Sequence, residues 1–327
     1  MPVISYIDAV TQALREEMRR DRRVFVLGED VGVRGGVFRA TNGLIEEFGE
    51  DRVLDTPLTE SAIVGVSIGA AAYGLRPVAE IQFADFIMPA VNQIVSEAAR
   101  LRYRSNNDWH CPLVIRAPYG GGVHGALYHS QSVESLFMSV PGLKIVTPST
   151  PYDVKGLLKA AIRDEDPVLF FEHKRCYRLI KGEVPEEDYT IPIGKADVKR
   201  EGTDVTVISY GLTLHFALKA AEELEKEGIS VHVLDLRTLR PLDKEAILEA
   251  AAKTGKVLII HEDNKTGGIG GEVSAIITEE AFFELDAPVR RLCGPDVPAM
   301  PYSPPLEKEY MLSPEKVAAA IRELAEF

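Results

Sequence analysis

The sequence is poor in cysteine and has no long apolar run. Its three cysteines, Cys111, Cys176 and Cys293, form no Cys-x-x-Cys pair, so a structural zinc site is not expected. Widely spaced thiols suit a reducing cytoplasm. No run of about 18 apolar residues is present to span a membrane, and the first residues lack the basic and apolar blocks of a secretory signal.

Positive charge is also scarce. The chain has 37 lysines and arginines against 50 aspartates and glutamates, which gives a net charge of −13. Such a surface repels phosphate backbones and argues against nucleic acid as the main partner. The rest of the composition is that of a globular protein. Because 327 residues exceed what one ordinary hydrophobic core accommodates, we expect two domains.

Apolar periodicity predicts strands that alternate with helices. Apolar residues recur at helical spacing from Ile4 to Met18, and a strand-like run follows at 24–27. Further strands are predicted at 78–83, 113–116, 143–147 and 168–172, with helices at 60–74, 86–104 and 151–163. Short buried strands that alternate with helices predict a mostly parallel sheet with helices on both faces.

A second alternating set follows a polar, proline-containing stretch near 181–195, which we interpret as a linker. Its predicted strands are 205–210, 231–236, 257–261 and 289–292, and its helices are 213–227, 243–253, 270–284 and 314–326. The predicted organisation is therefore a domain at 1–182, a linker at 183–197 and a domain at 198–327. Both domains are expected to be doubly wound α/β folds.

Two glycine motifs suggest functions that their context argues against. Gly65-Val-Ser67-Ile-Gly69 matches the G-x-S-x-G elbow of serine hydrolases, but small residues on both sides indicate the interior of a buried helix. Gly268-Ile-Gly270-Gly271 resembles the start of a dinucleotide fingerprint, but the third glycine would fall at Val273. A glycine-rich turn that starts a helix is the simpler interpretation of that segment.

Two other segments carry groups suited to catalysis. Glu60 ends the stretch DTPLTE just before a helix, where an acid often serves only as a favourable partner of the helix dipole. The second segment, YGGGVHGALYHSQS, combines three consecutive glycines with His124, His129 and Tyr128. Such a loop more often serves a site than a core. The five-residue spacings of His124, His129 and Glu134 do not place them on one helical face, which argues against a metal there.

Several long motifs in order resemble one family over essentially the whole chain. LGEDVGVRGGVFRAT, DTPLTE, AEIQFADF, GGGVHGALYHSQS, PSTPYDVKGLL and VLDLRTLRPLD are similar to the β subunits of the E1 components of 2-oxo acid dehydrogenase complexes. Within that family, HGALYHSQS, FFEHKRCYRLIKGEVP and GPDVPAMPY resemble the branched-chain type more than the pyruvate type. The resemblance implies a transketolase-like fold with an N-terminal pyrimidine-binding domain.

The resemblance also implies that the chain is half of an enzyme. Its relatives form an α2β2 heterotetramer with thiamine diphosphate at each α–β interface, where the α chain holds the diphosphate through Mg²⁺ and a Gly-Asp-Gly motif. That motif is absent here, since the nearest strings are Gly28-Glu29-Asp30 and Gly294-Pro295-Asp296. The implied reaction is decarboxylation of a branched-chain 2-oxo acid and acyl transfer to the lipoyl group of the E2 acyltransferase, which would dock on the C-terminal domain.

Individual roles carry over to matching positions. Glu60 is the implied catalytic partner of the aminopyrimidine ring, and His129 is the implied acid that protonates a lipoyl sulfur. The residues implied to line the aminopyrimidine pocket are Leu58, Gln82 and Phe86. Glu29 is implied to belong to an acidic proton path, although an exposed loop carboxylate is the plainer interpretation. The positions implied to hold a structural K⁺ are Leu113, Ala161, Asp164 and Asp166, where the two aspartates could equally cap a turn.

Three other functions remain open from the sequence. The same chemistry on pyruvate, or in an acetoin dehydrogenase, is the nearest alternative. A non-catalytic scaffold would leave Glu60 and His129 dispensable, and a serine hydrolase would need Ser67 exposed beside a histidine.

Overall fold

The computed structural model describes residues 1–327, and the chain divides into two units. The N-terminal unit comprises residues 1–119 and 136–193, and the C-terminal unit comprises residues 120–135 and 194–327. The sequence pattern placed the boundary within 183–197 and assigned 120–135 to the first domain, whereas that loop groups with the second unit. None of the helices combines the length and the apolar character that a membrane span requires.

The N-terminal unit is built on a parallel sheet. Its strands run in the order β6-β7-β5-β4-β2-β3, and every neighbouring pair is parallel. The strands are β2 (Val24–Gly28), β3 (Val53–Asp55), β4 (Arg76–Glu80), β5 (Val114–Tyr119), β6 (Lys144–Val146) and β7 (Val168–His173). A separate antiparallel pair joins β1 (Val3–Ser5) to β8 (Lys181–Glu183).

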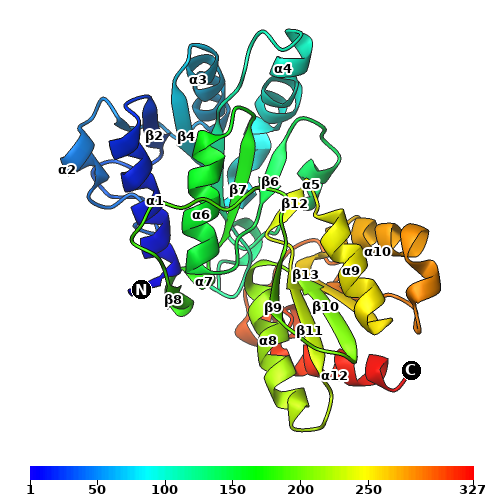
Figure 1. Ribbon diagram of the computed structural model, residues 1–327. Helices are drawn as coiled ribbons and strands as arrows, with labels where there is room; N and C mark the ends of the chain where they lie inside the picture. The colour runs from blue at the N-terminus through cyan, green and yellow to red at the C-terminus, as the bar shows by residue number, and fades with distance from the viewer. The chain divides into compact units, whose positions relative to one another are not determined.

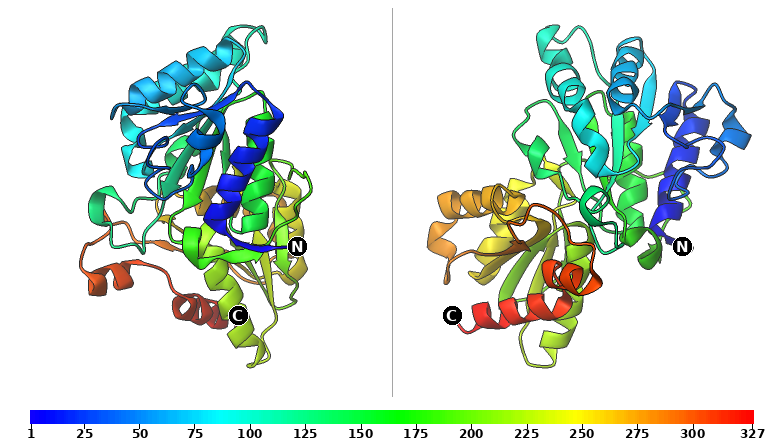
Figure 2. Two further views of the ribbon diagram at one scale, coloured as in Figure 1. Left: turned by 90° about the vertical axis from the view of Figure 1, so that its left-hand side faces the viewer. Right: turned by 180° about the vertical axis from the view of Figure 1, so that it is seen from behind.

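Helices cover both faces of this sheet (Figure 2). On one face α1 (Tyr6–Arg20) packs along α6 (Pro151–Arg163). On the other lie α3 (Glu60–Ala72) and the segment 84–104. Local sequence explains where the first two helices begin: Ser5 and Asp8 form a capping box at α1, and the Thr150 side chain caps α6.

A buried ion-pair network lies within the sheet. The Arg116 guanidinium donates to Glu172 at 2.7 and 2.6 Å and to Glu80 at 2.5 Å. The Tyr177 hydroxyl donates to Glu172 at 2.5 Å. Because the three charged groups project from the adjacent strands β4, β5 and β7, each buried charge has a partner. Burial raises the pKa of Glu80, against the lowering effect of Arg116.

The C-terminal unit repeats the architecture with a smaller sheet. Strands run in the order β14-β13-β10-β11-β9, and only β9 is antiparallel to its neighbour. They are β9 (Asp197–Arg200), β10 (Val205–Ser209), β11 (Val231–Asp235), β13 (Val257–Asn264) and β14 (Arg290–Gly294). The helices α8 (Gly211–Glu225) and α12 (Pro314–Ala325) pack together, as do α9 (Lys244–Thr254) and α10 (Ile269–Glu280) (Figure 1). The core between the first pair and the sheet is aliphatic.

The predicted fold class, two doubly wound α/β domains, is confirmed. The remaining short elements are α2 (Leu44–Phe48), η1 (Ala84–Ala90), η2 (Gln93–Glu97), η3 (Ala98–Arg100), α4 (Leu101–Arg104), η4 (Ala126–Tyr128), α5 (Ser135–Met138), α7 (Cys176–Leu179), β12 (Thr238–Arg240), η5 (Phe282–Glu284) and α11 (Pro304–Tyr310). The predicted helix at 86–104 is instead a succession of 3₁₀, π and α turns, because Pro89 lies inside it and interrupts the α-helical pattern.

The two glycine motifs have structural roles. Ser67 is fully buried within α3, and its hydroxyl donates to the Ile63 carbonyl at 2.7 Å, so it is not an exposed nucleophile. Gly268 is the N-cap of α10, as the glycine-turn interpretation predicted.

Candidate active site

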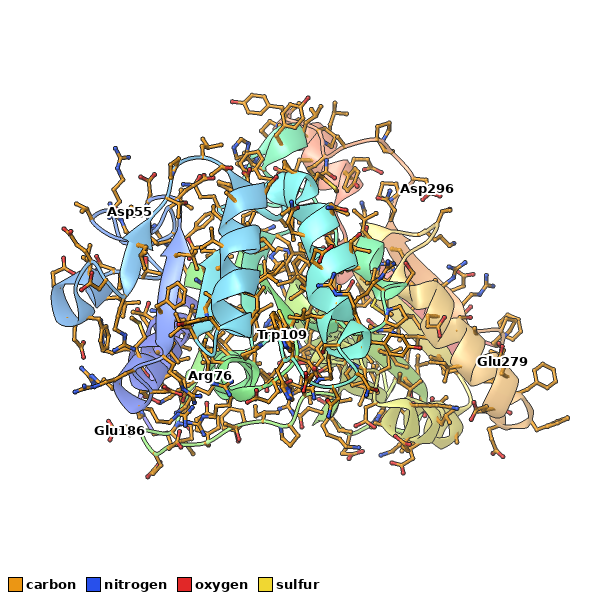
Figure 3. The ribbon with its side chains drawn as sticks, turned by 90° about the horizontal axis from the view of Figure 1, so that it is seen from above. Asp55, Arg76, Trp109, Glu186, Glu279 and Asp296 are labelled. Carbon is orange, nitrogen blue, oxygen red and sulfur yellow. The ribbon has the colours of Figure 1, made fainter.

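The N-terminal candidate residues gather at the carboxyl edge of the sheet. The strands β2, β3 and β4 lie side by side and end in register at Gly28, Asp55 and Glu80. The chain leaves these strands into the loops that carry Glu29, Glu60 and Gln82. In open parallel sheets this edge is the usual place for a ligand site. Figure 3 shows Asp55 at one end of α3, with Arg76 and Trp109 toward the other end.

Close backbone contacts fix the loop after β2. A Cβ at Gly28 would lie 2.6 Å from the Glu80 carbonyl oxygen, so only glycine allows the two strands this approach. The Asp55 carboxylate accepts hydrogen bonds from the N–H groups of Gly32 at 2.6 Å and Val33 at 3.3 Å. These contacts fix the two ends of the loop that carries Glu29.

Glu29 and Glu60 form a pair of nearby carboxylates. Both are 7% exposed, and no lysine or arginine pairs with either. Burial raises the pKa of Glu29, and the negative charges of Glu60 and Asp30 raise it further. The Thr59 N–H bonds to the Glu29 carboxylate, whereas Glu29 Oε1 is buried without a hydrogen-bond partner. Two acids held together in this way can share and pass a proton.

The other predicted pocket residues lie around this pair. The Gln82 side-chain amide is 3.5 Å from the carboxylate of Asp30, the residue after Glu29. Phe86 lies on η1, which packs against α3, and its ring meets the Phe83 ring edge-to-face at 5.7 Å. Leu58 is 81% exposed, so any partner of its side chain must come from outside this unit. The structure therefore brings Glu60, Glu29, Gln82 and Phe86 to one edge.

His129 lies on the loop 120–135 of the C-terminal unit, which we call the histidine loop. Four residues of this loop have left-handed backbone angles: Gly120, Gly122, His124 and Ala126. For His124 and Ala126 this conformation is strained and must be held by surrounding contacts. A Cβ at Gly125 would lie 2.7 Å from both the Cβ and the carbonyl oxygen of His129, so the turn packs directly on the half-buried catalytic candidate.

Carboxylates far along the chain hold the histidine loop. Glu262 accepts from the Gly121 N–H at 2.6 Å. Glu307 accepts from the N–H groups of Gly122 and His124, both at 3.2 Å. It also lies 2.5 Å from His124 Nδ1. These contacts explain why residues 120–135 belong to the C-terminal unit.

A buried acid cluster lies at the other end of the loop. Glu134 is fully buried, and its Oε1 accepts from the Tyr210 hydroxyl at 2.7 Å. Burial raises the pKa of Glu134 to about 8, with smaller contributions from the carboxylates of Asp263 and Glu262. Burial also raises the pKa of Asp263, which accepts from the Ser135 N–H. The cluster therefore holds a proton at neutral pH. Because of this proton, two carboxyl groups can lie close together within it.

The four residues predicted to hold K⁺ lie together at the amino edge of the N-terminal sheet. Their oxygens already have protein donors. The Leu113 carbonyl accepts from the Val168 N–H, and the Ala161 carbonyl accepts from the Asp164 N–H. The Asp164 carbonyl accepts from the Arg76 guanidinium. Lys144 pairs with the carboxylates of both Asp164 and Asp166, and Arg102 pairs with that of Asp166. The Lys144 ammonium thus supplies positive charge between the two carboxylates. A carbonyl oxygen that accepts one hydrogen bond keeps a second lone pair, so the three carbonyls can still bind a cation, and the K⁺ site stays a prediction.

Sequence reasoning missed the carboxylates that hold the histidine loop. Glu262 and Asp263 lie near the carboxyl end of the buried strand β13, in the string HED, at the edge where functional groups of α/β units gather. Their position at that edge was the signal in the sequence that could have identified them. Glu307 gave none, because it lies on a seven-residue helix far from the loop in sequence.

Comparison with known proteins agrees with this geometry. The model of the transketolase pyrimidine-binding domain matches residues 3–180, and the model of the transketolase C-terminal domain matches residues 194–317. A solved split-gene transketolase, described as an inactive β4 tetramer, has a TM-score of 0.80 and 26% identity, covering 99% of this chain and 98% of its own. The two units are thus the paired α/β domains of transketolase-type proteins.

Relatives in sequence identify the family within the transketolase-type proteins. The 2-oxoisovalerate dehydrogenase subunit beta of Bacillus subtilis is 74% identical over 327 residues, which is all of both chains. The pyruvate dehydrogenase E1 component subunit beta of the same organism is 50% identical over the same full length. The chain belongs to the family of 2-oxo acid dehydrogenase E1 β subunits, as its motifs predicted.

Proposed function

We propose that this chain is the β half of a thiamine diphosphate-dependent enzyme that decarboxylates a branched-chain 2-oxo acid and transfers the acyl group to lipoyl. The structural observation that carries the proposal is the buried Glu29–Glu60 pair at the carboxyl edge of the N-terminal sheet. The 74% identity to a 2-oxoisovalerate dehydrogenase β subunit supports the choice of a branched-chain acid.

The residues at this edge fit the aminopyrimidine half of thiamine diphosphate. Glu60 has no ion-pair partner, so its carboxyl group is available to bond a ring nitrogen, and the Phe86 ring offers a stacking surface. When bound, the cofactor supplies the electron sink for loss of CO₂. Glu60 would hold and share the proton at the ring nitrogen, and Glu29 would relay protons to and from Glu60.

His129 would act at the second step. A half-buried imidazole on a strained, held loop is suited to deliver one proton to a fixed point. We propose that it protonates a lipoyl sulfur as the acyl group is transferred. The lipoyl group comes from the E2 acyltransferase, which the C-terminal unit is proposed to bind.

A separate α chain is proposed to complete the site. The chain lacks the Gly-Asp-Gly motif expected to bind Mg²⁺ and the diphosphate. The helix α3, which starts at Glu60, exposes an apolar stripe that includes Ala62, Val66 and Tyr73, the last two being 61% and 91% exposed. Exposed apolar stripes of this kind mark protein interfaces. We propose that the α chain covers this stripe and so places its diphosphate site beside Glu60.

The test is decarboxylation of 3-methyl-2-oxobutanoate and of pyruvate with thiamine diphosphate and Mg²⁺. The assay uses this chain alone and then with its α partner. We expect activity only in the mixture, and faster turnover of the branched acid. Pyruvate is the second candidate substrate because of the 50% identity to a pyruvate dehydrogenase β subunit. Activity of the chain alone would place the diphosphate site here and contradict the proposal.

We also propose the K⁺ site and a location in the cytoplasm. A melting temperature that rises with KCl but not with choline chloride at equal ionic strength would indicate a bound K⁺. All three cysteines are free thiols, which suits the reducing cytoplasm.

A further inference from the structure

Glu307 is an acid in an unusual position. Its side chain is only 4% exposed, although α11, which carries it, is otherwise largely exposed. A buried carboxylate is costly unless charge or hydrogen bonds compensate it. Its partners come from the histidine loop: Oε1 accepts from the Gly122 and His124 N–H groups, and Oε2 faces His124 Nδ1.

The contacts of Glu307 fall on the strained part of the loop. Gly122 and His124 both have left-handed backbone angles, and so does Ala126 two residues later. A non-glycine residue keeps such angles only where its surroundings enforce them. The N–H bonds and the imidazole contact of Glu307 supply that enforcement at His124, whose own side chain is 62% exposed and packs little elsewhere.

The strained turn is connected directly to His129. Gly125 follows His124, and its Cα approaches the His129 backbone so closely that a Cβ would meet both the Cβ and the carbonyl oxygen of His129 at 2.7 Å. The backbone at His124 and Gly125 therefore borders the space that His129 occupies, and a displaced turn would disturb the position of His129. The path runs from Glu307 through His124 and Gly125 to the proposed acid.

We infer that Glu307 is a positioning residue that holds the histidine loop so that His129 meets the lipoyl group. This inference rests on the proposed role of His129 in acyl transfer. Glu307 touches no reacting atom and acts through His124. It should therefore affect the acyl-transfer step and leave decarboxylation, which depends on Glu60 in the N-terminal unit, unchanged.

The test compares Glu307→Ala, Glu307→Gln and the control Glu309→Ala, each in the full chain assembled with the α chain. Glu309 lies on the same helix and is exposed. We expect Glu307→Ala to slow acylation of a lipoyl domain at least tenfold while decarboxylation, measured with an artificial electron acceptor, stays within twofold. Glu307→Gln keeps an acceptor for the N–H groups and should recover part of the loss, and Glu309→Ala should match the parent protein.

Hydrogen exchange gives a readout that does not depend on activity. In the free chain, peptides from 120–132 should exchange faster in Glu307→Ala than in Glu309→Ala, while peptides from the two sheets stay unchanged. Unchanged loop exchange, or normal acyl transfer in Glu307→Ala, would overturn the inference. His129→Ala is measured in parallel. If it spares acyl transfer, the proposed role of His129 fails, and loop exchange alone decides whether Glu307 holds the loop.

Discussion

The carboxylate of Glu60 raises the pKa of Glu29, after burial, which is the larger cause. The two acids come from different loops, one after β2 and one at the start of α3, and neither has a basic partner. Paired acids without a compensating cation are destabilising in a purely structural setting. Their presence at the carboxyl edge of a parallel sheet is therefore best explained by proton transfer to a bound ligand.

Glu60→Gln should abolish decarboxylation by the assembled enzyme. The amide cannot share a proton with the aminopyrimidine ring, and loss of a positioned acid–base group costs about 10²–10⁴-fold in rate. The measurement is 2-oxo acid decarboxylation with an artificial electron acceptor at saturating thiamine diphosphate. Glu29→Gln is the matched control, for which we expect a smaller loss because Glu29 acts through Glu60. Normal turnover in Glu60→Gln would refute the assignment.

His129→Ala should separate the two half-reactions. Decarboxylation depends on the N-terminal edge and should persist, whereas acylation of a lipoyl domain should fall by about 10²–10⁴-fold because the proton donor is lost. Both rates are measured on one preparation assembled with the α chain. Tyr128→Ala, a change at the exposed neighbouring position, serves as the control. Equal loss of both activities in His129→Ala would rule out a role confined to acyl transfer.

The alternation of strands and helices was predictable because it depends on local apolar periodicity. The helix α6 was predicted to the residue, since a threonine cap and Pro151 define its start. Strand β3 was not predicted, because three residues with Leu54 partly exposed carry no periodic signal. Glu60 and His129 stood out only through motifs. Glu307 could not be predicted, because its role depends on a tertiary contact across 183 residues of sequence with His124.

The stability of the protein should depend on Glu134 between mildly acidic and mildly basic pH. Its pKa is raised from 4.5 to about 8 in the folded state, so the folded chain keeps a proton that the unfolded chain releases. The stabilisation that Glu134 gives the folded state is therefore fully present below pH 4.5 and is lost as the pH rises toward 8. Glu134→Gln, which is neutral throughout and still accepts from Tyr210, should gain stability over the parent by about 1 kcal/mol per pH unit in this range.

Denaturant unfolding of the free chain at pH 5.5, 6.5 and 7.5 measures this difference. The exposed residue Glu249 supplies the control variant Glu249→Gln, which should follow the parent at every pH. A gap between Glu134→Gln and the parent that stays constant with pH would mean that Glu134 is ionised in the folded protein.

Val66→Asp should prevent assembly without unfolding the chain. Val66 is 61% exposed in the middle of α3, so the substitution removes little packing from the isolated chain, and it changes helix propensity little because valine and aspartate have similar values. An α chain that covers the stripe would instead bury an unpaired carboxylate, at a cost of several kcal/mol. Sedimentation velocity of mixtures with the α chain should show separate components for Val66→Asp and one larger species for the parent.

The control is Leu179→Asp, an exposed apolar position on α7 of the same unit, which should assemble normally. Assembly of Val66→Asp with unchanged affinity would place the α chain on another surface and separate the exposed stripe of α3 from the cofactor site.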